Sequence, residues 1–573
     1  MKLLSRESSK SILVAFSVSL GVILVVASAF GMYYEEYQAL FNAMLSGKLS
    51  PGVPFDSWYF MAYIGISKIY SWLYQLNFQI EWIGWISVVF ILISGMLLNK
   101  LFIRSIILEK GNLFGLISLV SFSFIILSDH VLNFHFARVS YLLCASSMLC
   151  MIIIFSSINS IKERKTLFFG LLLLFVLGTL TRSEPSIATA LLLTCFAVVW
   201  HGKISQGLLS ALPALSISLI VVIGILIDIH YTDDFHKLVE PDIEMQLTVR
   251  GNVVPLSNMT NAMDSLRYEG ALRMIWGDPE IITVEFMRSL IDKAPYSSWD
   301  SSQWQRTLLI LEEFVSKHFV AILFNTILLL LIVVFQAIMG RSLNALLTLL
   351  YLIGFFIAIA GQTYLVKMTP WSLSPYLSVF TAGNLLLGFR EFRKGLWISA
   401  LQFGLSAYVF VYAWMIWNSS EYLKSKHVYQ KEVYVQAENI AKGQTLLITP
   451  SSFQPFLSAT RPLVPFDFSS FKEVYFYESQ LASILPGYRD YLEQECLCDV
   501  TNFSNFYRFL LDKQYPNKVF VMSTADRVDL ITRYLKGIHQ FEVVHEEVCP
   551  LAKKTFKLPN YQQQVMLYQL KTE

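Results

Sequence analysis

The sequence predicts a mainly α-helical, polytopic membrane helical bundle of about eleven spans, with its N-terminus inside and its C-terminus outside, and a small C-terminal extracytoplasmic α/β domain. Of the 573 residues, 55% are hydrophobic and 15% are charged, whereas soluble globular chains carry roughly 25% charged residues. Uncharged apolar runs of membrane-spanning length recur as far as residue 417 and then stop. The net charge of +2 gives no global field that would attract nucleic acid.

The first predicted span covers residues 11–32 and follows Lys2, Arg6 and Lys10. Because basic residues mark the cytoplasmic side, this span is expected to run from inside to outside. A cleaved signal peptide is the alternative. The apolar run is longer than the hydrophobic region of such a peptide and lacks a clear small-x-small site before Tyr33, which favours a retained anchor.

Further apolar runs predict the remaining spans, and basic residues fall in alternate connections between them. The spans are 82–98, 113–127, 139–157, 167–180, 186–200, 208–227, 319–339, 343–365, 373–389 and 396–417. The basic connections contain Lys100, Arg104, Lys110, Lys162, Arg164, Lys165, Lys203, Arg341, Arg390, Arg393 and Lys394. These connections are therefore expected in the cytoplasm, and the long polar segments outside.

This sidedness requires that residues 58–76 do not cross the bilayer. The segment contains Lys68 and is rich in Trp and Tyr, which favours a helix lying in the membrane interface. If it crosses instead, every later connection changes side and the agreement with the basic residues is lost.

The predicted domains are a membrane domain, residues 1–420, and a soluble outer α/β domain, residues 421–573. Residues 33–81 and 231–318 form outer loops of the first domain, and the second of these shows helical patterns at 261–276 and 281–293. In the outer domain, strand-like runs at 445–448, 473–476, 518–522, 541–544 and 564–570 alternate with helical runs at 503–513 and 525–534.

The cysteines divide by environment. Cys144, Cys150 and Cys195 lie within apolar spans, where a thiol is a small hydrophobe. Cys496, Cys498 and Cys549 lie in the outer domain, where an oxidising compartment would allow a disulfide from Cys549 to one of the other two. No histidine spacing accompanies them, so a zinc site is not indicated.

Two adjacent carboxylates follow the first span, in Tyr33-Tyr34-Glu35-Glu36-Tyr37. Acidic groups at a membrane surface need either hydration or a function. Neighbouring helical residues point about 100 degrees apart, so one carboxylate would act in catalysis while the other is hydrated or binds a metal. The alternative is an acidic cap at a helix start.

Glu35-Glu36-Tyr37 together with Gly47 resembles the motif of the polytopic GT-C glycosyltransferases, an acidic pair followed by tyrosine and then glycine. The family more often carries aspartate there, and no subfamily is identified. The resemblance implies helices parallel to the membrane in the first outer loop, and transfer from a polyprenyl-phosphate-linked sugar donor to a glycan, lipid or protein acceptor. More loosely, the chain resembles polytopic proteins of bacterial polysaccharide loci, which implies the bacterial inner (plasma) membrane and the cell envelope. Some relatives use a divalent cation and others do not, so no cofactor is assigned.

A second candidate is Thr181-Arg182-Ser183-Glu184-Pro185, which joins two spans and is similar to the arginine-proline-acid turns of GT-C relatives. Arg182 could present a planar fork to a lipid phosphate. The alternative is an internal pair with Glu184 that caps the helical hairpin.

Three more basic groups are expected on the outer side: His135 and Arg138, one helical turn apart, and Lys367. They are predicted phosphate ligands, and the alternative is that they extend to the interface without a ligand. Asp228, His230, Asp233 and Asp234 suggest a cation site, although a hydrated loop start is the favoured interpretation.

The sequence thus predicts a membrane glycosyltransferase in which Glu35 or Glu36 is the general base and Arg138, Arg182, Lys367 and His135 bind the phosphate. The alternatives are a flippase or transporter of lipid-linked glycans and a non-catalytic envelope assembly protein. Transporters often show internal repeats and charges at the membrane midplane. Here the charges gather at the ends of spans and no repeat is evident, which favours the enzyme.

Overall fold

The computed structural model describes residues 2–34, 64–77, 79–105, 113–155, 158–230, 261–272, 283, 285–286, 289, 299–366, 370–392, 396–449, 462–463, 468–476, 486–500, 502–512, 518–551 and 564–571. The chain divides into two compact units. The first comprises Met1–Tyr33, Gly84–Ile225 and Trp304–Tyr422. The second comprises Tyr34–Ile83, Leu226–Gln303 and Leu423–Glu573.

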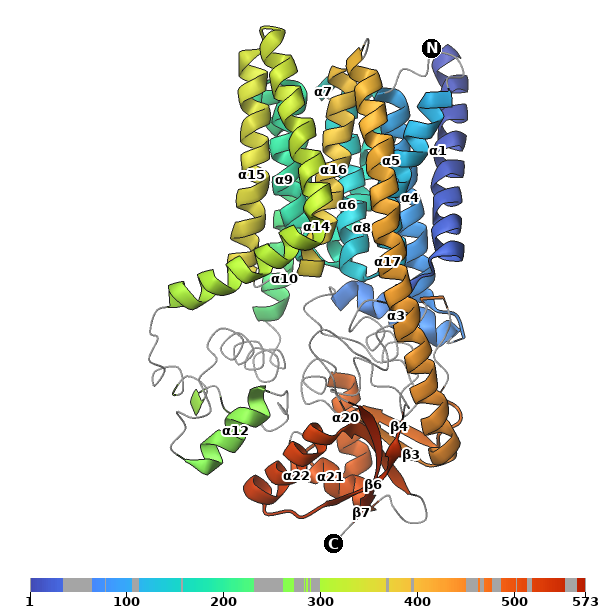
Figure 1. Ribbon diagram of the computed structural model, residues 1–573, viewed down its shortest axis with the longest axis vertical. Coiled ribbons are helices and arrows are strands. Elements are labelled where there is room, and N and C mark those ends of the chain that lie inside the picture. Colours follow the sequence, from blue (N-terminus) through green and yellow to red (C-terminus); the bar gives the residue numbers. More distant parts are fainter. Residues whose placement is uncertain are drawn as a thin grey trace. The chain divides into compact units, whose positions relative to one another are not determined.

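The first unit is a bundle of long helices that run side by side (Figure 1). The helices that lie wholly or mostly in this unit are α1 (Lys2–Ala29), α4 (Trp82–Ser105), α5 (Leu113–Leu132), α6 (Phe136–Ile154), α7 (Ile158–Glu163), α8 (Lys165–Thr181), α9 (Ser183–His201), α10 (Ile204–His230), α14 (Trp299–Ile338), α15 (Ser342–Val366), α16 (Pro370–Glu391) and α17 (Leu396–Ala441). Two short strands, β1 (Tyr33–Tyr34) and β2 (Asn133–Phe134), follow α1 and α5.

A helix occupies each predicted span, and eight helices in the described part of the chain are long and apolar enough to cross a membrane. They are Lys10–Ala29, Trp82–Arg104, Leu113–Leu132, Phe136–Ile154, Ile204–Gly224, Thr307–Ile338, Ser342–Gly361 and Leu396–Ala441. Lys165–Thr181 and Ser186–His201 are shorter apolar helices. The chain is therefore built as a polytopic membrane protein.

Helix α6 is the centre of the bundle and packs against α8, α9 and α16. Its close contact with α8 depends on Gly178, where an added Cβ would lie 2.6 Å from the Cys144 sulfur. Small residues allow this approach, as is common between membrane helices. Buried hydrogen bonds add to the packing elsewhere in the bundle: Asn325 Nδ2 donates to Thr381 Oγ1 at 2.8 Å and thereby links α14 to α16.

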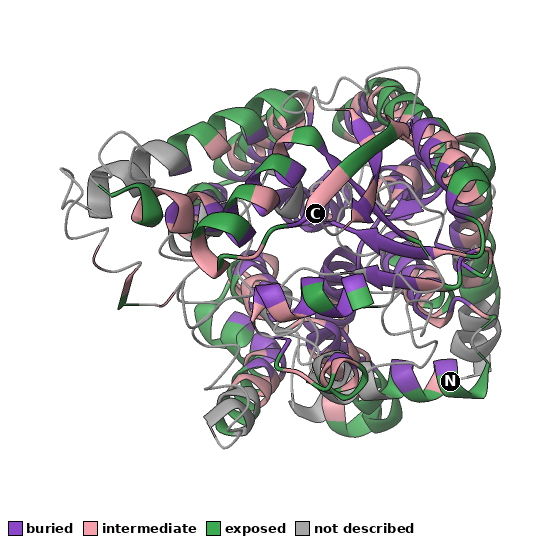
Figure 2. Cartoon of the chain, turned by 90° about the horizontal axis from the view of Figure 1, so that it is seen from below, coloured by how far each residue is buried: buried purple, intermediate pink, exposed green. Residues whose placement is uncertain are grey.

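The second unit contains a five-stranded mixed sheet in the order β4-β3-β5-β7-β6. The strands are β3 (Thr445–Ile448), β4 (Glu473–Phe476), β5 (Val519–Thr524), β6 (Val544–Pro550) and β7 (Val565–Lys571). Strand β3 is parallel to β4 and β5, whereas β7 is antiparallel to β5 and β6. Strands β3 and β5 are buried along their whole length. Figure 2 shows the buried strands of this sheet in purple.

The helices of the second unit are α3 (Ile64–Leu76), α12 (Ala262–Leu272), α20 (Pro486–Cys496), α21 (Phe503–Asp512) and α22 (Ala525–His539). Most strands and helices predicted for residues 421–573 are therefore present. The strand predicted at 541–544 is wrong, since β6 begins at Val544. The predicted disulfide is also wrong: Cys496 pairs with Cys498, and Cys549 is a free thiol.

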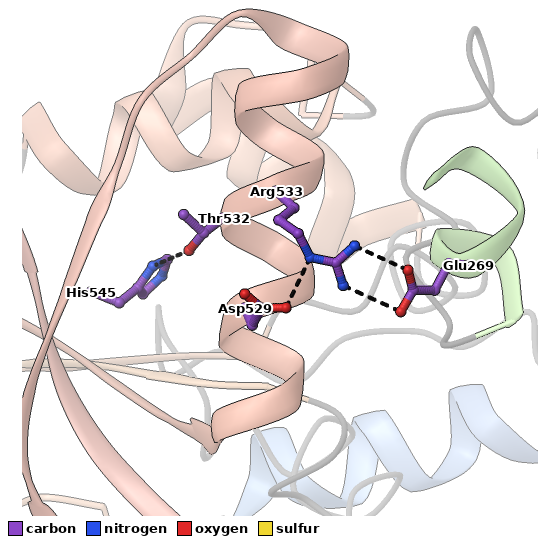
Figure 3. Close-up of polar contacts among 5 residues, drawn as sticks. All are labelled: Glu269, Asp529, Thr532, Arg533 and His545. Carbon is purple, nitrogen blue, oxygen red and sulfur yellow. Dashed lines mark hydrogen bonds and ion pairs between the residues drawn. The ribbon is translucent and has the colours of Figure 1, made fainter. Parts of the chain in front are cut away.

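Helix α12, from the predicted large outer loop, packs on α22 (Figure 3). The Arg533 guanidinium donates to both carboxylate oxygens of Glu269, at 3.2 and 3.3 Å, and its Nε donates to Asp529 at 2.8 Å. Beside this contact, a Cβ at Gly537 would lie 2.9 Å from Leu266 Cδ2. The absence of a side chain at Gly537 thus lets the two helices approach.

Candidate functional site

The predicted general bases, Glu35 and Glu36, and the predicted phosphate ligand Lys367 lie outside the described residues. The side chains of the predicted cation cluster at 228–234 also lie outside them. The remaining predicted ligands, His135, Arg138 and Arg182, are described. All three belong to the helical bundle.

These three residues lie at one end of the bundle, where α5 and α8 end and α6 and α9 begin. His135 is the N-cap of α6, and its Nδ1 accepts a hydrogen bond from the Ala137 N–H at 3.1 Å. Since Nδ1 is an acceptor, the neutral ring carries its proton on Nε2. His135 and Arg182 are 47 residues apart in the sequence. The packing of α6 against α8 brings them to the same end of the bundle.

Electrostatics decide which protonation state His135 adopts. Burial lowers the pKa of His135 well below its usual value, and the nearby positive charges of Arg182 and Arg138 lower it further. The ring is therefore neutral at neutral pH. His135 can donate a hydrogen bond to an anion there, but it does not supply the positive charge that the sequence suggested.

Arg138 is buried and forms an ion pair with Asp129 of α5. Asp129 also accepts hydrogen bonds from Asn133 Nδ2 at 2.7 Å and from Ser374 Oγ at 3.3 Å. Three helices, α5, α6 and α16, thus converge on one carboxylate. Much of the charge of Arg138 is compensated by Asp129, which sequence reasoning did not identify as its partner.

Arg182 sits at the joint between α8 and α9. Its guanidinium lies over the Phe136 ring, 5.6 Å from the centroid, and its carbonyl oxygen accepts a hydrogen bond from Ser140 Oγ at 3.0 Å. These contacts hold the joint against the first turns of α6. The predicted pair with Glu184 involves a side chain outside the described residues.

His318 is a further polar residue near this end. The backbone of α14 leaves helical geometry at His318, with φ −112° and ψ 17°, and the ring is close enough to Asp129 for an electrostatic interaction. His318 carried no signal in the sequence, because it is an isolated histidine beside Lys317 at the start of an apolar run and belongs to no spacing pattern. In the part of the chain that the structure describes, no cluster of three or more His, Cys, Asp or Glu residues could hold a metal ion.

Comparison with known protein families finds no match, and comparison with curated proteins finds none either. Among solved structures, the chain is similar to the archaeal oligosaccharyltransferase AglB from Archaeoglobus fulgidus, in complex with an inhibitory peptide and a dolichol-phosphate. The match covers 91% of this chain and 71% of that chain, with 10% sequence identity and a TM-score of 0.37. So loose a likeness assigns neither a reaction nor a substrate to the chain.

Proposed function

We propose that the chain is a membrane glycosyltransferase that moves a sugar from a polyprenyl-phosphate-linked donor to an acceptor on the extracytoplasmic face. The observation that carries the proposal is the convergence of Arg138, Arg182 and His135 at one end of the bundle. The sequence had placed these residues on the same side as the Glu35-Glu36 motif. A lipid-phosphate donor cannot leave the bilayer, so it must be bound at the end of the spans.

In the proposed reaction, Glu35 or Glu36 takes the proton from an acceptor hydroxyl as the oxygen attacks the anomeric carbon. The new bond joins the acceptor oxygen to that carbon, while the bond from the carbon to the phosphate oxygen breaks. Negative charge then builds on the departing lipid phosphate. Positively charged groups fixed near that phosphate would stabilise the transition state more strongly than the ground state.

The basic residues take different parts in this proposal. Arg182 contacts the phosphate directly, and Lys367 is a second contact. Arg138, compensated by Asp129, holds the start of α6 in place and adds to the local positive potential. His135 donates one hydrogen bond as a neutral ring.

The proposal also fixes the topology: about eleven spans, the N-terminus inside, and residues 421–573 outside. Reporter fusions after Leu76, Lys165, Asp300 and Glu573 are expected to report outside, inside, outside and outside. An inside location at Asp300 would put the two predicted outer loops on opposite sides and contradict the proposed site.

The activity itself is tested by mass-spectrometric profiling of lipid-linked and surface glycans. Cells carry the wild-type protein, a deletion, Glu35→Gln, Glu36→Gln or the double variant, at matched expression. Loss of the same sugar unit in the deletion and in one Gln variant supports transfer and identifies the base. If the deletion changes the glycan while the double variant matches wild type, the carboxylate mechanism is wrong, and transport or assembly becomes the better account.

Arg182→Ala extends this test, with Arg164→Ala as its matched control. Both arginines flank α8, at opposite ends, and Arg164 is exposed. Removing one transition-state contact typically lowers turnover by about a hundredfold. The proposal expects such a loss for Arg182→Ala and near wild-type glycans for Arg164→Ala. Equal behaviour of the two variants would remove Arg182 from the site.

A further inference from the structure

The disulfide of the second unit joins Cys496 and Cys498, which are separated by a single residue in the sequence. It lies where helix α20 ends, and both cysteines are half-buried. Leu497 between them is 91% exposed, the highest value among the large hydrophobic residues that the structure describes. The bond therefore lies at the surface of this unit, beside an apolar side chain that reaches into solvent.

The backbone at Leu497 adopts an unfavourable conformation. Its φ is 51°, in the left-handed region, where the Cβ of most L-residues crowds the neighbouring carbonyl oxygen. A helix often ends with one residue in this region, but that residue is usually glycine. The turn at Leu497 brings the Cα atoms of Cys496 and Cys498 to 5.0 Å, within the range that a disulfide requires. Reduction of the bond would let Leu497 leave the left-handed region.

Other contacts hold the chain on both sides of the disulfide. Before it, Leu492 of α20 is fully buried, and after it Val500 is fully buried. The Asp499 carbonyl accepts hydrogen bonds from the Asn502 N–H at 3.3 Å and from Asn505 Nδ2 at 3.0 Å. A cross-link over so short a loop also removes little conformational entropy from the unfolded chain. Stability is therefore a weak reason for this bond.

A third cysteine of the same unit, Cys549, is a free thiol. Burial raises the pKa of the Cys549 thiol above its usual value, so that less thiolate is present at neutral pH. The thiolate is the form that attacks a disulfide. Cys549 is therefore a poor competitor for the bond between Cys496 and Cys498, and it provides an internal reference for experiments on that bond.

We propose that Cys496–Cys498 is a redox-active disulfide that exchanges with the dithiol of a partner protein. Strained or exposed disulfides are the more easily reduced ones, whereas structural disulfides resist reduction. This disulfide is accessible, spans one intervening residue and keeps Leu497 in an unfavourable conformation. The Leu497 side chain gives the partner an apolar contact next to the sulfurs. The redox site does not depend on sugar transfer.

The exchange consists of two substitutions at sulfur. A thiolate of the partner attacks one sulfur of the disulfide and forms a mixed disulfide with it. The other sulfur leaves as a thiolate and takes up a proton. The second thiolate of the partner then breaks the mixed disulfide, and the released cysteine is protonated in turn. Cys496 and Cys498 together gain two electrons and two protons, which the partner dithiol loses as it becomes a disulfide.

The first test measures how fast the bond is reduced in folded, full-length protein in detergent. The reductant is dithiothreitol or reduced thioredoxin, thiols are blocked at timed points, and mass spectrometry gives the reduced fraction of the peptide with Cys496 and Cys498. The rate should lie within about tenfold of the rate in the unfolded chain, because the sulfurs are accessible. Cys549 should be a thiol in every sample.

Three outcomes of this test would overturn the proposal. The first is reduction only after unfolding. The second is a native protein in which Cys496 and Cys498 are already thiols when it is isolated without reductant. The third is a bond from Cys549 to either of them.

Substitutions at Leu497 separate backbone strain from partner contact. Asparagine adopts the left-handed region more readily than leucine, so Leu497→Asn should shift the equilibrium with a dithiothreitol buffer severalfold toward the disulfide. Leu497→Ala removes the apolar side chain and should slow reduction by thioredoxin severalfold, with an unchanged dithiothreitol rate. Val548→Ala, at another exposed apolar residue, is the control and should change neither. An unshifted equilibrium in Leu497→Asn or an unchanged thioredoxin rate in Leu497→Ala overturns the proposal.

The double variant Cys496→Ser/Cys498→Ser tests whether the bond is structural. Removal of a structural disulfide typically destabilises a protein strongly. The double variant should instead fold and unfold in urea at the wild-type midpoint, because Leu492, Val500 and the Asp499 hydrogen bonds remain. A marked fall of the midpoint would assign the bond a structural role and contradict the proposal.

Discussion

Two arginines of this chain each bind carboxylates, in opposite surroundings. Arg138 in the bundle pairs with Asp129, and their side chains are 4% and 17% exposed. Arg533 in the second unit binds Asp529 and Glu269, and the side chains of Arg533, Asp529 and Glu269 are 48%, 65% and 20% exposed. The two pairs therefore differ most in the arginine, which is buried in the first and half exposed in the second.

The difference in burial predicts which of the two ion pairs contributes more to the stability of the fold. Breaking a buried pair leaves a charge without compensation in a medium of low dielectric constant, and the penalty is large. Breaking an exposed pair lets water solvate both partners, and the loss is small. The Arg138–Asp129 pair should therefore be indispensable to the bundle, whereas the Arg533 contacts should select the position of α12 with little effect on stability.

The largest expected effect comes from Arg138→Gln. It leaves Asp129 buried with Asn133 and Ser374 as its remaining hydrogen-bond donors, and should destabilise the bundle by about 3–5 kcal/mol. The measurement is the folded fraction in detergent after a temperature ramp. The double variant Asp129→Asn/Arg138→Gln removes both charges and should recover much of the loss. Wild-type stability in Arg138→Gln would contradict the comparison.

A second test asks whether burial also makes a charged side chain destabilising outside the helical bundle. His545 lies in the five-stranded sheet of the second unit and shares a 3.0 Å hydrogen bond with Thr532 of α22 (Figure 3). Burial lowers the pKa of His545 to about 4. Below the unfolded pKa of about 6.5, the unfolded state binds the proton more readily. The contribution of neutral His545 is thus complete above pH 6.5 and is lost as the pH falls toward 4.

The predicted size of this loss is roughly 1 to 3 kcal/mol, measured as the difference in the free energy of chemical unfolding of the sheet-containing part of the protein between pH 7 and pH 4. His545→Gln does not titrate and should show a smaller difference between the two pH values. His539→Gln, at the end of the same α22, is the control and should behave as wild type. An identical pH response in His545→Gln would show that another group is responsible.

Buried polar groups that carry no charge separate the effect of charge from the effect of burial. Asn384 Nδ2 donates to Asn325 Oδ1 at 2.8 Å, and Asn325 in turn donates to Thr381. Hydrogen bonds between membrane helices contribute about 1 kcal/mol each, so Asn325→Ala should cost roughly 1–2 kcal/mol in the same temperature ramp. Ser316→Ala, exposed on the same helix, is its control. A loss as large as that of Arg138→Gln would mean that charge is not the deciding factor.

The smallest effect is expected at Arg533. A double-mutant cycle with Glu269→Ala and Arg533→Ala should give a coupling energy below about 1 kcal/mol. Raising the salt concentration to about 1 M should reduce the coupling, because screening is strong for exposed charges. A coupling energy above about 2 kcal/mol that does not respond to salt would show that this contact behaves like the buried pair.

The sequence could predict the helices of the bundle because apolar runs of bilayer length are a local signal. Strand β6 was misplaced because it is a polar edge strand: Glu546 and Glu547 are exposed and give no alternating apolar pattern. The cysteine pairing was wrong because the distance between thiols is a property of the folded chain. Their shared domain suggested a bond from Cys549 to Cys496 or Cys498, whereas Cys496 bonds Cys498.

The arrangement of the candidate site could also be predicted only in part from the sequence. Residue type and side predicted that His135, Arg138 and Arg182 belong together, and the structure brings them to one end of the bundle. Two features could not be predicted: the partner of Arg138, which depends on how α5 meets α6, and the buried hydrogen bond from Tyr74 to Glu81, which depends on the path of α3. The roles of Glu35, Glu36 and Lys367 stay predictions.

The central claim is sugar transfer from a lipid phosphate by a carboxylate base, and its most direct test uses purified protein in lipid nanodiscs. The measurement is the release of polyprenyl phosphate together with glycosylated acceptor, for wild type and for Glu35→Gln/Glu36→Gln. The account predicts coupled formation of both products by wild type and a loss of about a hundredfold or more in the double variant. Equal turnover by the two proteins, or wild-type protein that forms neither product, would contradict it.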